Sequence, residues 1–263
     1  MAFSQSRIIA SRFLARLALS SGLLAALSLS LIPSAVAHQP VTLTSADGKI
    51  SQSQILADGT VSWAVYANFT KSNQSRYFRF ALETGQRLKA EYLIFDKAPD
   101  NSLKNSRLPI VTITSPSGKK IQLAVNERNK FFEPFSGQRY LFLSRIDRSG
   151  EAGVYTVKIQ SRAAVTAIIA VGVNEVRGEV MQIGNKVGDC PAPLKDGEAI
   201  PQSSATQLIG LKKRSAEVCA ELSGWIYRVG EEDGEQFALT RDYRINRITV
   251  TIESGIITEV LVG

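Results

Sequence analysis

A charged segment close to Gly263 holds the side chains best suited to recognition chemistry: Thr240-Arg-Asp-Tyr-Arg-Ile-Asn-Arg247. Arg247 carries five N–H donors in a fixed fork, so it could bind loop carbonyls and the carboxylate of Asp242 together. A segment tied in this way would be stiffened without being buried. An exposed Arg241 on it would suit a partner pocket with an acidic floor, whereas on a simple connection it would be an ordinary surface residue.

A strand, a turn and a second strand would position this segment. Apolar and polar residues alternate strictly from Arg247 to Ile252, which predicts a half-buried strand. Arg247 and Thr249 would project from the face away from the core, beneath a loop that arches back over the sheet. Glu253-Ser-Gly255 supplies the turn. The polar residues before the strand lack a period and predict an exposed loop.

A short helix and one more strand precede the loop. The pattern predicts a helix from about Ser215, a suitable N-cap residue, to Leu222, and places Gly224 just beyond its C-terminus. Residues 225–229 then form a strand. The order within residues 206–263 is therefore helix, strand, long loop and second strand.

The run from Thr240 to Arg247, followed by Ile248-Thr-Val and ending in Val262-Gly263, resembles the reactive-site loop of the potato inhibitor I family. It equally resembles the bacterial peptidase inhibitor I78 family, whose pattern is close to T-x-D-Y-R-x-x-R-h-x-h with a C-terminal Gly. Both families are serine-protease inhibitors that present an extended loop as a substrate that is barely released. The resemblance covers residues 206–263 and implies a small α+β module in which the loop joins two parallel strands over the helix.

This resemblance also implies roles for particular residues. The position after the loop Thr is the specificity residue P1, which is Arg241 here, with Thr240 as P2 and Asp242 as P1′. The implied partner is a trypsin-like or subtilisin-like serine protease. The reactive loop would consist of Thr240, Arg241, Asp242 and Tyr243, and its supporting residues would be Arg244, Arg247 and Thr249.

The chain departs from the family patterns in three places. Potato inhibitor I members commonly have two Arg beneath the loop, and the second position here is Thr249. Arg247 alone would support a softer loop, with weaker inhibition or easier cleavage. The acidic stretch 231–236 lengthens the approach to the loop, either as a solvated turn or as a segment that repels acidic proteases or binds calcium weakly. I78 members often have a Cys before the C-terminal Gly, where this chain has Val262.

The first 37 residues have the features of a signal peptide. Three arginines precede a Leu/Ala/Ser-rich apolar run, and an A-x-A pattern ends at Ala37, which would leave His38 as the new N-terminus. This predicts a secreted or periplasmic protein with no membrane association after cleavage. An uncleaved anchor is the alternative, but the run is short and broken by Ser.

Export sets the expected state of the cysteines and the surface charge. Cys190 and Cys219 are expected to form a disulfide that staples the linker to the inhibitor helix. The formal net charge is +7, and +4 remains without the signal segment, spread along the chain. Such a charge predicts a soluble surface rather than nucleic-acid binding.

Residues 38–175 predict an antiparallel, jelly-roll-like β-sandwich, which makes the chain mainly β. Short alternating segments such as Val61–Phe69 are separated by Gly-containing turns, and Ala163–Val173 is apolar enough to be a buried strand. Residues 176–205 are rich in Pro, Gly and Ser and predict a linker. The strand and turn motifs resemble those of the bacterial pre-peptidase C-terminal domain, an accessory module of secreted proteins; they are Arg76-Tyr-Phe-Arg-Phe, Ile113-Thr-Ser-Pro-Ser-Gly118 and Gly153-Val-Tyr-Thr-Val157.

The sequence offers little for catalysis. It has one His, His38, and lacks the common metal, phosphate-loop and dinucleotide motifs, so we expect no enzyme, metal or cofactor. A carboxylate pair is the one hydrolase arrangement that the sequence leaves open. The favoured function is a secreted serine-protease inhibitor with Arg241 at P1. The alternative is a non-catalytic cell-envelope or extracellular binding or adhesion module, which would show an exposed aromatic patch on the sandwich.

Overall fold

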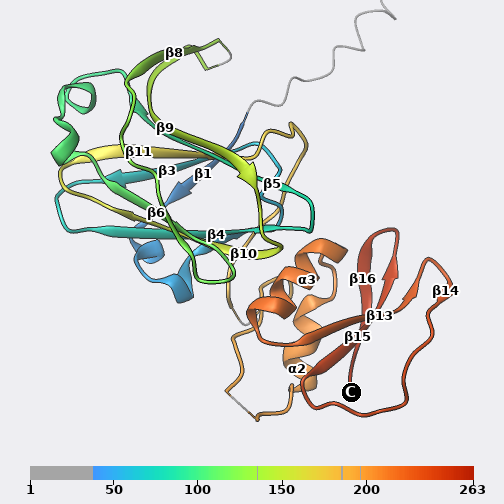
Figure 1. Ribbon diagram of the computed structural model, residues 1–263. Coiled ribbons are helices and arrows are strands. Elements are labelled where there is room, and N and C mark those ends of the chain that lie inside the picture. The colour runs from blue at the N-terminus through green and yellow to red at the C-terminus, as the bar shows by residue number, and fades with distance from the viewer. Residues whose placement is uncertain (1–37, 135, 185, 196) are drawn as a thin grey trace, which may run out of the picture. The chain divides into compact units, whose positions relative to one another are not determined.

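The computed structural model describes residues 38–263 except 135, 185 and 196 (Figure 1), so the predicted signal peptide lies outside the described residues. The described part of the chain is mainly β, as predicted, with two six-stranded sheets and one four-stranded sheet. Among the described residues, no helix is both long and apolar enough to cross a membrane.

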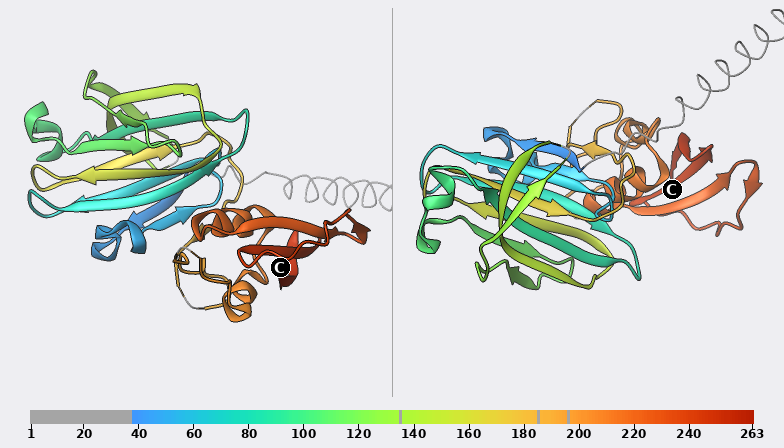
Figure 2. Two further views of the ribbon diagram at one scale, coloured as in Figure 1. Left: turned by 60° about the horizontal axis from the view of Figure 1, so that its bottom comes forward. Right: turned by 90° about the horizontal axis from the view of Figure 1, so that it is seen from above.

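Two sheets form the sandwich, and Figure 2 gives further views of them. Sheet A contains, in spatial order, β1 (Gln39–Leu43), β3 (Trp63–Phe69), β11 (Val165–Val171), β5 (Arg87–Phe95), β9 (Gln138–Ser149) and β8 (Asn129–Glu133). Sheet B contains β12 (Val180–Met181), β2 (Gln54–Leu56), β4 (Ser75–Leu82), β10 (Gly153–Gln160), β6 (Ile110–Thr114) and β7 (Lys120–Gln122). Short 3-10 turns lie between strands at Ser45–Gly48, Ile50–Gln52, Asp100–Ser102 and Asn105–Arg107.

The core of the sandwich comes from alternate residues of both sheets. Val65 and Tyr92 from sheet A share one buried cluster with Phe80 and Tyr155 from sheet B. The rings of Phe80 and Tyr155 stack with their centroids 5.0 Å apart. Period-2 alternation therefore sends one face of each sheet inward, as the sequence predicts.

The strand pairing is mostly antiparallel, with one exception in each sheet. β1 pairs with β3 in parallel, and β2 pairs with β4 in parallel. The predicted apolar segment 163–173 contains β11, which lies between β3 and β5 and is buried over most of its length. This inner position protects an aggregation-prone strand from exposure at a sheet edge.

The C-terminal part combines sheet C with a helix. Sheet C has the order β14 (Glu235–Gln236), β13 (Ile226–Glu232), β15 (Arg247–Glu253) and β16 (Ile256–Val262). β13 and β15 are parallel, while β15 and β16 form an antiparallel hairpin. Helices α2 (Gln202–Ala205) and α3 (Lys213–Leu222) and a 3-10 turn at Thr206–Leu208 precede the sheet.

The start of the helix differs from the prediction. α3 begins at Lys213, with Lys212 at the N-cap position, so Ser215 is not the N-cap. Ser215 is instead buried, and its hydroxyl donates a hydrogen bond to the carboxylate of Glu179. Gly224 has a φ of +73°, the left-handed conformation expected just after a helix.

One buried cluster joins the helix to sheet C and to residues of sheet B. It includes Val218 from α3 and Val250 from β15, together with Ile55 from β2 and Ala81 from β4. The carboxylate of Glu221 also accepts a hydrogen bond of 3.0 Å from the backbone N–H of Val154. The α3 helix is therefore packed on two sides.

Cys190 and Cys219 form the predicted disulfide, with their Cα atoms 4.8 Å apart and a sequence separation of 29. In the chain-entropy account, closing a loop of this length stabilises the fold by about 3–4 kcal/mol. We therefore expect the Cys190→Ala/Cys219→Ala variant to lose about that much free energy of unfolding in chemical denaturation. A loss below about 1 kcal/mol would show that the disulfide constrains the unfolded chain far less than this account requires.

The division at the predicted linker is tested by limited proteolysis. Thermolysin, a metalloprotease that a serine-protease inhibitor does not block, is expected to cut between Ala192 and Ser204, where most residues are exposed. The two resistant fragments should stay linked through Cys190–Cys219 and separate only on reduction. Joint degradation of both fragments would argue for one integrated domain, which the shared buried cluster would then explain.

Candidate functional site, an exposed loop held by two arginines

The predicted reactive segment is an exposed connection between β14 and β15. Residues 237–244 form neither helix nor strand, and every residue from 237 to 246 is exposed. The large side chains of Phe237, Leu239, Tyr243 and Ile245 are among them, with Tyr243 exposed over 70% of its surface. Figure 1 shows the segment as a wide arch outside sheet C. An exposed stretch of this length needs bonds from elsewhere to keep one shape.

Arg247 supplies the first set of these bonds. It is the first residue of β15 and only 4% exposed. Its guanidinium donates to both carboxylate oxygens of Asp242 at 3.2 Å and also to the Asp242 carbonyl oxygen. Its Nε donates to the carbonyl oxygen of Gly263 at 3.0 Å. Arg247 thus binds loop backbone and loop carboxylate together, as predicted from its donor geometry.

Arg228 supplies a second set of bonds that the sequence analysis missed. It lies on β13 directly opposite Thr249 of β15 in the parallel ladder. Its Nε and Nη2 donate to the Thr249 hydroxyl at 3.0 and 2.7 Å. Its Nη1 lies 3.4 Å from both the carbonyl and the hydroxyl oxygen of Thr240. The expectation that Arg247 is the only arginine beneath the loop is therefore wrong.

Thr249, which the sequence analysis placed among the supporting residues, acts by binding Arg228. The sequence suggested that a Thr at this position removes a second arginine and softens the loop. Its hydroxyl instead accepts from Arg228 and so directs that guanidinium toward Thr240. The second arginine comes from the neighbouring strand, and Thr249 helps to orient it.

Asp242 is the one acidic residue of the segment 237–246, and its carboxylate is bound by several partners. The pKa of its carboxyl group is held well below the ordinary value, first by a hydrogen bond with the Thr240 side chain and then by those from Arg244 and Arg247. Arg244 contributes through its Nε, 2.7 Å from a carboxylate oxygen, although both partners of this ion pair are exposed. The predicted support by Arg244 is therefore direct but open to solvent screening.

Gly263 also takes part in the hydrogen bonds that hold the loop. Its N–H donates to the Arg247 carbonyl oxygen at 2.9 Å, and its carbonyl oxygen accepts from Arg247 and Arg228. Its φ is +126°, and a Cβ atom there would lie 2.7 Å from the ring of Tyr243. The positive φ favours Gly at this position, and a Cβ atom there would require the exposed Tyr243 ring to move.

Arg241 lies between the two held residues, and its own side chain is exposed. Among the described residues, no hydrogen bond or ion pair engages its guanidinium. The backbone on both sides of Arg241 is thus held, while the side chain itself is available to a partner.

The pKa shift of Asp242 gives a prediction about pH. Because the folded-state pKa is depressed, the stabilisation by this carboxylate is fully present above the unfolded-state value of about 3.9 and is lost only as pH falls through the lower folded-state value. The contact with Arg247 should therefore survive at about pH 4, where an ordinary Asp is half protonated. An NMR titration of the Asp242 carboxyl carbon should show a midpoint clearly below about 3.9. A midpoint at or above that value would show that the carboxylate is not engaged in solution.

The acidic stretch 231–236 forms the β13–β14 hairpin, whose turn lies at Asp233-Gly234. Glu232 pairs with Lys213 at 2.6 Å, and the Asp233 carboxylate accepts from the Ser254 N–H at 2.6 Å. No group of three or more His, Cys, Asp or Glu side chains able to hold a metal ion occurs in the described part of the chain. These contacts favour a solvated turn, the first of the readings left open by the sequence.

Comparison with known proteins adds no assignment. No protein-family model matches the chain, and no curated protein matches it. The function is therefore argued from the geometry of the loop and from the residues that hold it.

Proposed function

We propose that this chain is a secreted serine-protease inhibitor that presents Thr240–Tyr243 as a substrate-like loop with Arg241 at P1. The main support for the proposal is that the residues on the two sides of the Arg241–Asp242 peptide bond are held by two different arginines. Thr240, before Arg241, is held by Arg228, and Asp242, after it, is held by Arg247. The exposed bond between Arg241 and Asp242 lies between these two supports.

Such support explains how a loop can resemble a substrate and still inhibit. A protease that cuts the Arg241–Asp242 bond leaves both new ends attached to the same sheet, because Arg228 and Arg247 each retain one of them. The ends then stay close enough to be rejoined, and the products do not diffuse away. The restrained loop also loses little conformational entropy when it binds.

The proposal includes export from the cell and membership of a serine-protease inhibitor family. Disulfides form and persist in oxidising compartments. The buried Cys190–Cys219 disulfide therefore supports export as a secreted or periplasmic protein. Likeness to the potato inhibitor I and I78 families is supported by the helix, the parallel pair β13–β15 and the loop that joins these strands. An acidic S1 pocket of the trypsin type would complement Arg241.

Titration of a fixed amount of trypsin with the purified protein tests the proposal. Residual activity should fall linearly and reach its minimum near one inhibitor per enzyme, while subtilisin, which prefers apolar P1 residues, should be inhibited less. If neither enzyme is inhibited, the proposal fails and the extracellular binding module becomes the leading function.

A further inference from the structure

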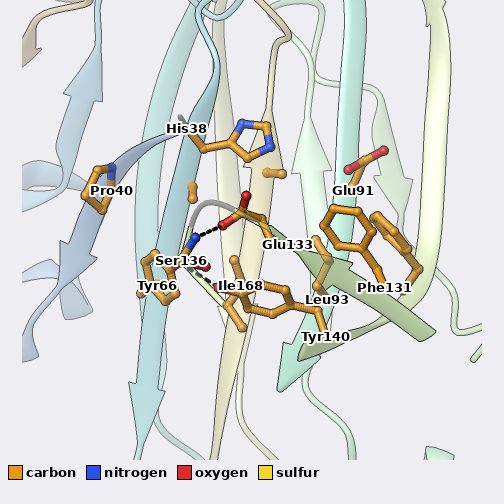
Figure 3. A pocket seen from close by; sticks show the side chains of 13 residues that line it. His38, Pro40, Tyr66, Glu91, Leu93, Phe131, Glu133, Ser136, Tyr140 and Ile168 are labelled. Atoms are coloured by element: carbon orange, nitrogen blue, oxygen red, sulfur yellow. Dashed lines mark hydrogen bonds between the residues drawn. The ribbon is translucent and has the colours of Figure 1, made fainter. Parts of the chain in front are cut away.

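A second candidate site lies on the sandwich, in a cavity of about 360 Å³ on the outer face of sheet A. Its lining includes Tyr66, Glu91, Phe131, Glu133, Tyr140 and Phe142, which together are called the aromatic pocket here. Figure 3 shows these side chains, apart from the unlabelled Phe142, around one space. The volume suits a small ligand, since pockets for such ligands begin at roughly 300 Å³.

The pocket follows from the alternation of the strands. On β5, Tyr92 and Ile94 point into the sandwich core, so Glu91 and Leu93 point the other way. The same holds on β9, where Leu141 is in the core cluster and Tyr140 is in the pocket. The β8 strand, paired to β9, adds Phe131 and Glu133 at the rim. A sheet face that would otherwise be solvated therefore carries aromatic rings.

The rings form a continuous set of contacts. The centroids of Phe131 and Tyr140 are 6.4 Å apart, and those of Phe131 and Phe142 are 5.2 Å apart. The guanidinium of Arg145 lies 4.6 Å from the centroid of the Phe142 ring, so one ring of the set already faces a cation. The negative face of an aromatic ring attracts cations in this way.

The carboxylates give the pocket its charge. The acidic side chains in the lining are those of Glu91 and Glu133, and the carboxylate of Glu133 accepts a hydrogen bond of 2.6 Å from the Ser136 N–H. His38 also lines the pocket, whereas no Lys or Arg side chain does so among the described residues. The nearby Arg145 is bound by both carboxylate oxygens of Glu127, at 2.6 and 2.8 Å. Glu91 is half-buried, and no hydrogen bond or ion pair to its carboxylate is formed within the described part of the chain. Burial without such a partner raises the pKa of Glu91.

We propose that the aromatic pocket binds a small organic cation, an alkylammonium or quaternary ammonium group that lies against the rings with its charge facing Glu91 and Glu133. Aromatic faces and carboxylates are complementary to such a cation, and the half-buried Glu91 forms no direct ion pair within the described part of the chain. The site is separate from the loop on sheet C and does not depend on the proposed inhibition.

NMR titration of the purified protein with choline tests this proposal. The control ligand is dimethylbutanol, the uncharged analogue in which carbon replaces the ammonium nitrogen. Choline should shift the ring signals of Phe131 and Tyr140 and bind at least about tenfold more tightly than dimethylbutanol. Glu91→Gln should remove most of this difference without changing the affinity for dimethylbutanol. Glu259→Gln, an exposed acid on β16, is the matched control and should leave choline binding unchanged.

Phe131→Leu provides a second variant if Glu91→Gln fails to fold, because it removes one ring and keeps an apolar side chain. It should weaken choline binding several-fold. Equal affinity for the two ligands would overturn the proposal, as would ring shifts induced by methyl glucoside but not by choline. Unchanged choline binding in both variants, or no binding of choline, would overturn it as well.

Discussion

Arg241→Ala is expected to weaken the inhibition of trypsin by at least about 2 kcal/mol, or roughly thirtyfold in the inhibition constant. The side chain is exposed and unengaged within the described part of the chain, so its removal leaves the loop network intact. The whole loss would therefore come from the empty S1 pocket of the protease. Inhibition constants of the wild type and the variant, measured at one ionic strength, give the result.

Two controls separate this effect from a general change of charge. Arg241→Lys keeps a cation at P1 and should retain most of the inhibition of trypsin. Lys195→Ala removes an exposed cation outside the loop and should have no effect. If Arg241→Ala inhibits as well as the wild type, Arg241 is not P1 and the register of the loop in the protease must be redrawn.

Arg247→Ala should change the duration of inhibition more than its initial strength. The P1 side chain remains, but the bonds to the carboxylate and carbonyl of Asp242 and to Gly263 are lost. The cut end that begins at Asp242 would then move away before it could be rejoined. We expect trypsin to be inhibited at first and to recover over time, at least about tenfold sooner than with the wild type.

The other arginines provide graded comparisons. Arg228→Ala should act in the same direction, because it releases Thr240 on the opposite side of the bond. Arg244→Ala removes only an exposed ion pair and should have a much smaller effect. Equal persistence of inhibition for the wild type and Arg247→Ala would contradict a bracing function for this network.

Local patterns in the sequence predicted the elements around the site well. Strict alternation predicted the strand that contains Arg247, and the donor geometry of that residue predicted its bonds to Asp242. The predicted start of α3 was wrong because the buried hydroxyl of Ser215 is bound to Glu179, 36 residues away. A local capping rule contains no information on such a contact.

The features that escaped prediction depend on which strands become neighbours. Arg228 reaches the loop only because β13 pairs with β15 in parallel, in the register that sets it against Thr249, 21 residues along the chain. The aromatic pocket likewise combines residues of β3, β5, β8 and β9, whose spatial order differs from their order in the sequence. Periodicity predicts the face of the sheet on which a side chain lies, but strand pairing determines which residues it contacts.

The most direct test of the proposed function is to identify the peptide bond that trypsin cuts during prolonged inhibition. The protein would be incubated with a catalytic amount of trypsin and sampled over time by mass spectrometry under denaturing conditions. We predict cleavage at Arg241–Asp242, which releases a fragment of residues 242–263, and a constant ratio of cut to intact protein that is also reached from the cut form. Complete digestion of the loop without inhibition, or a principal cut at another bond, would contradict the account.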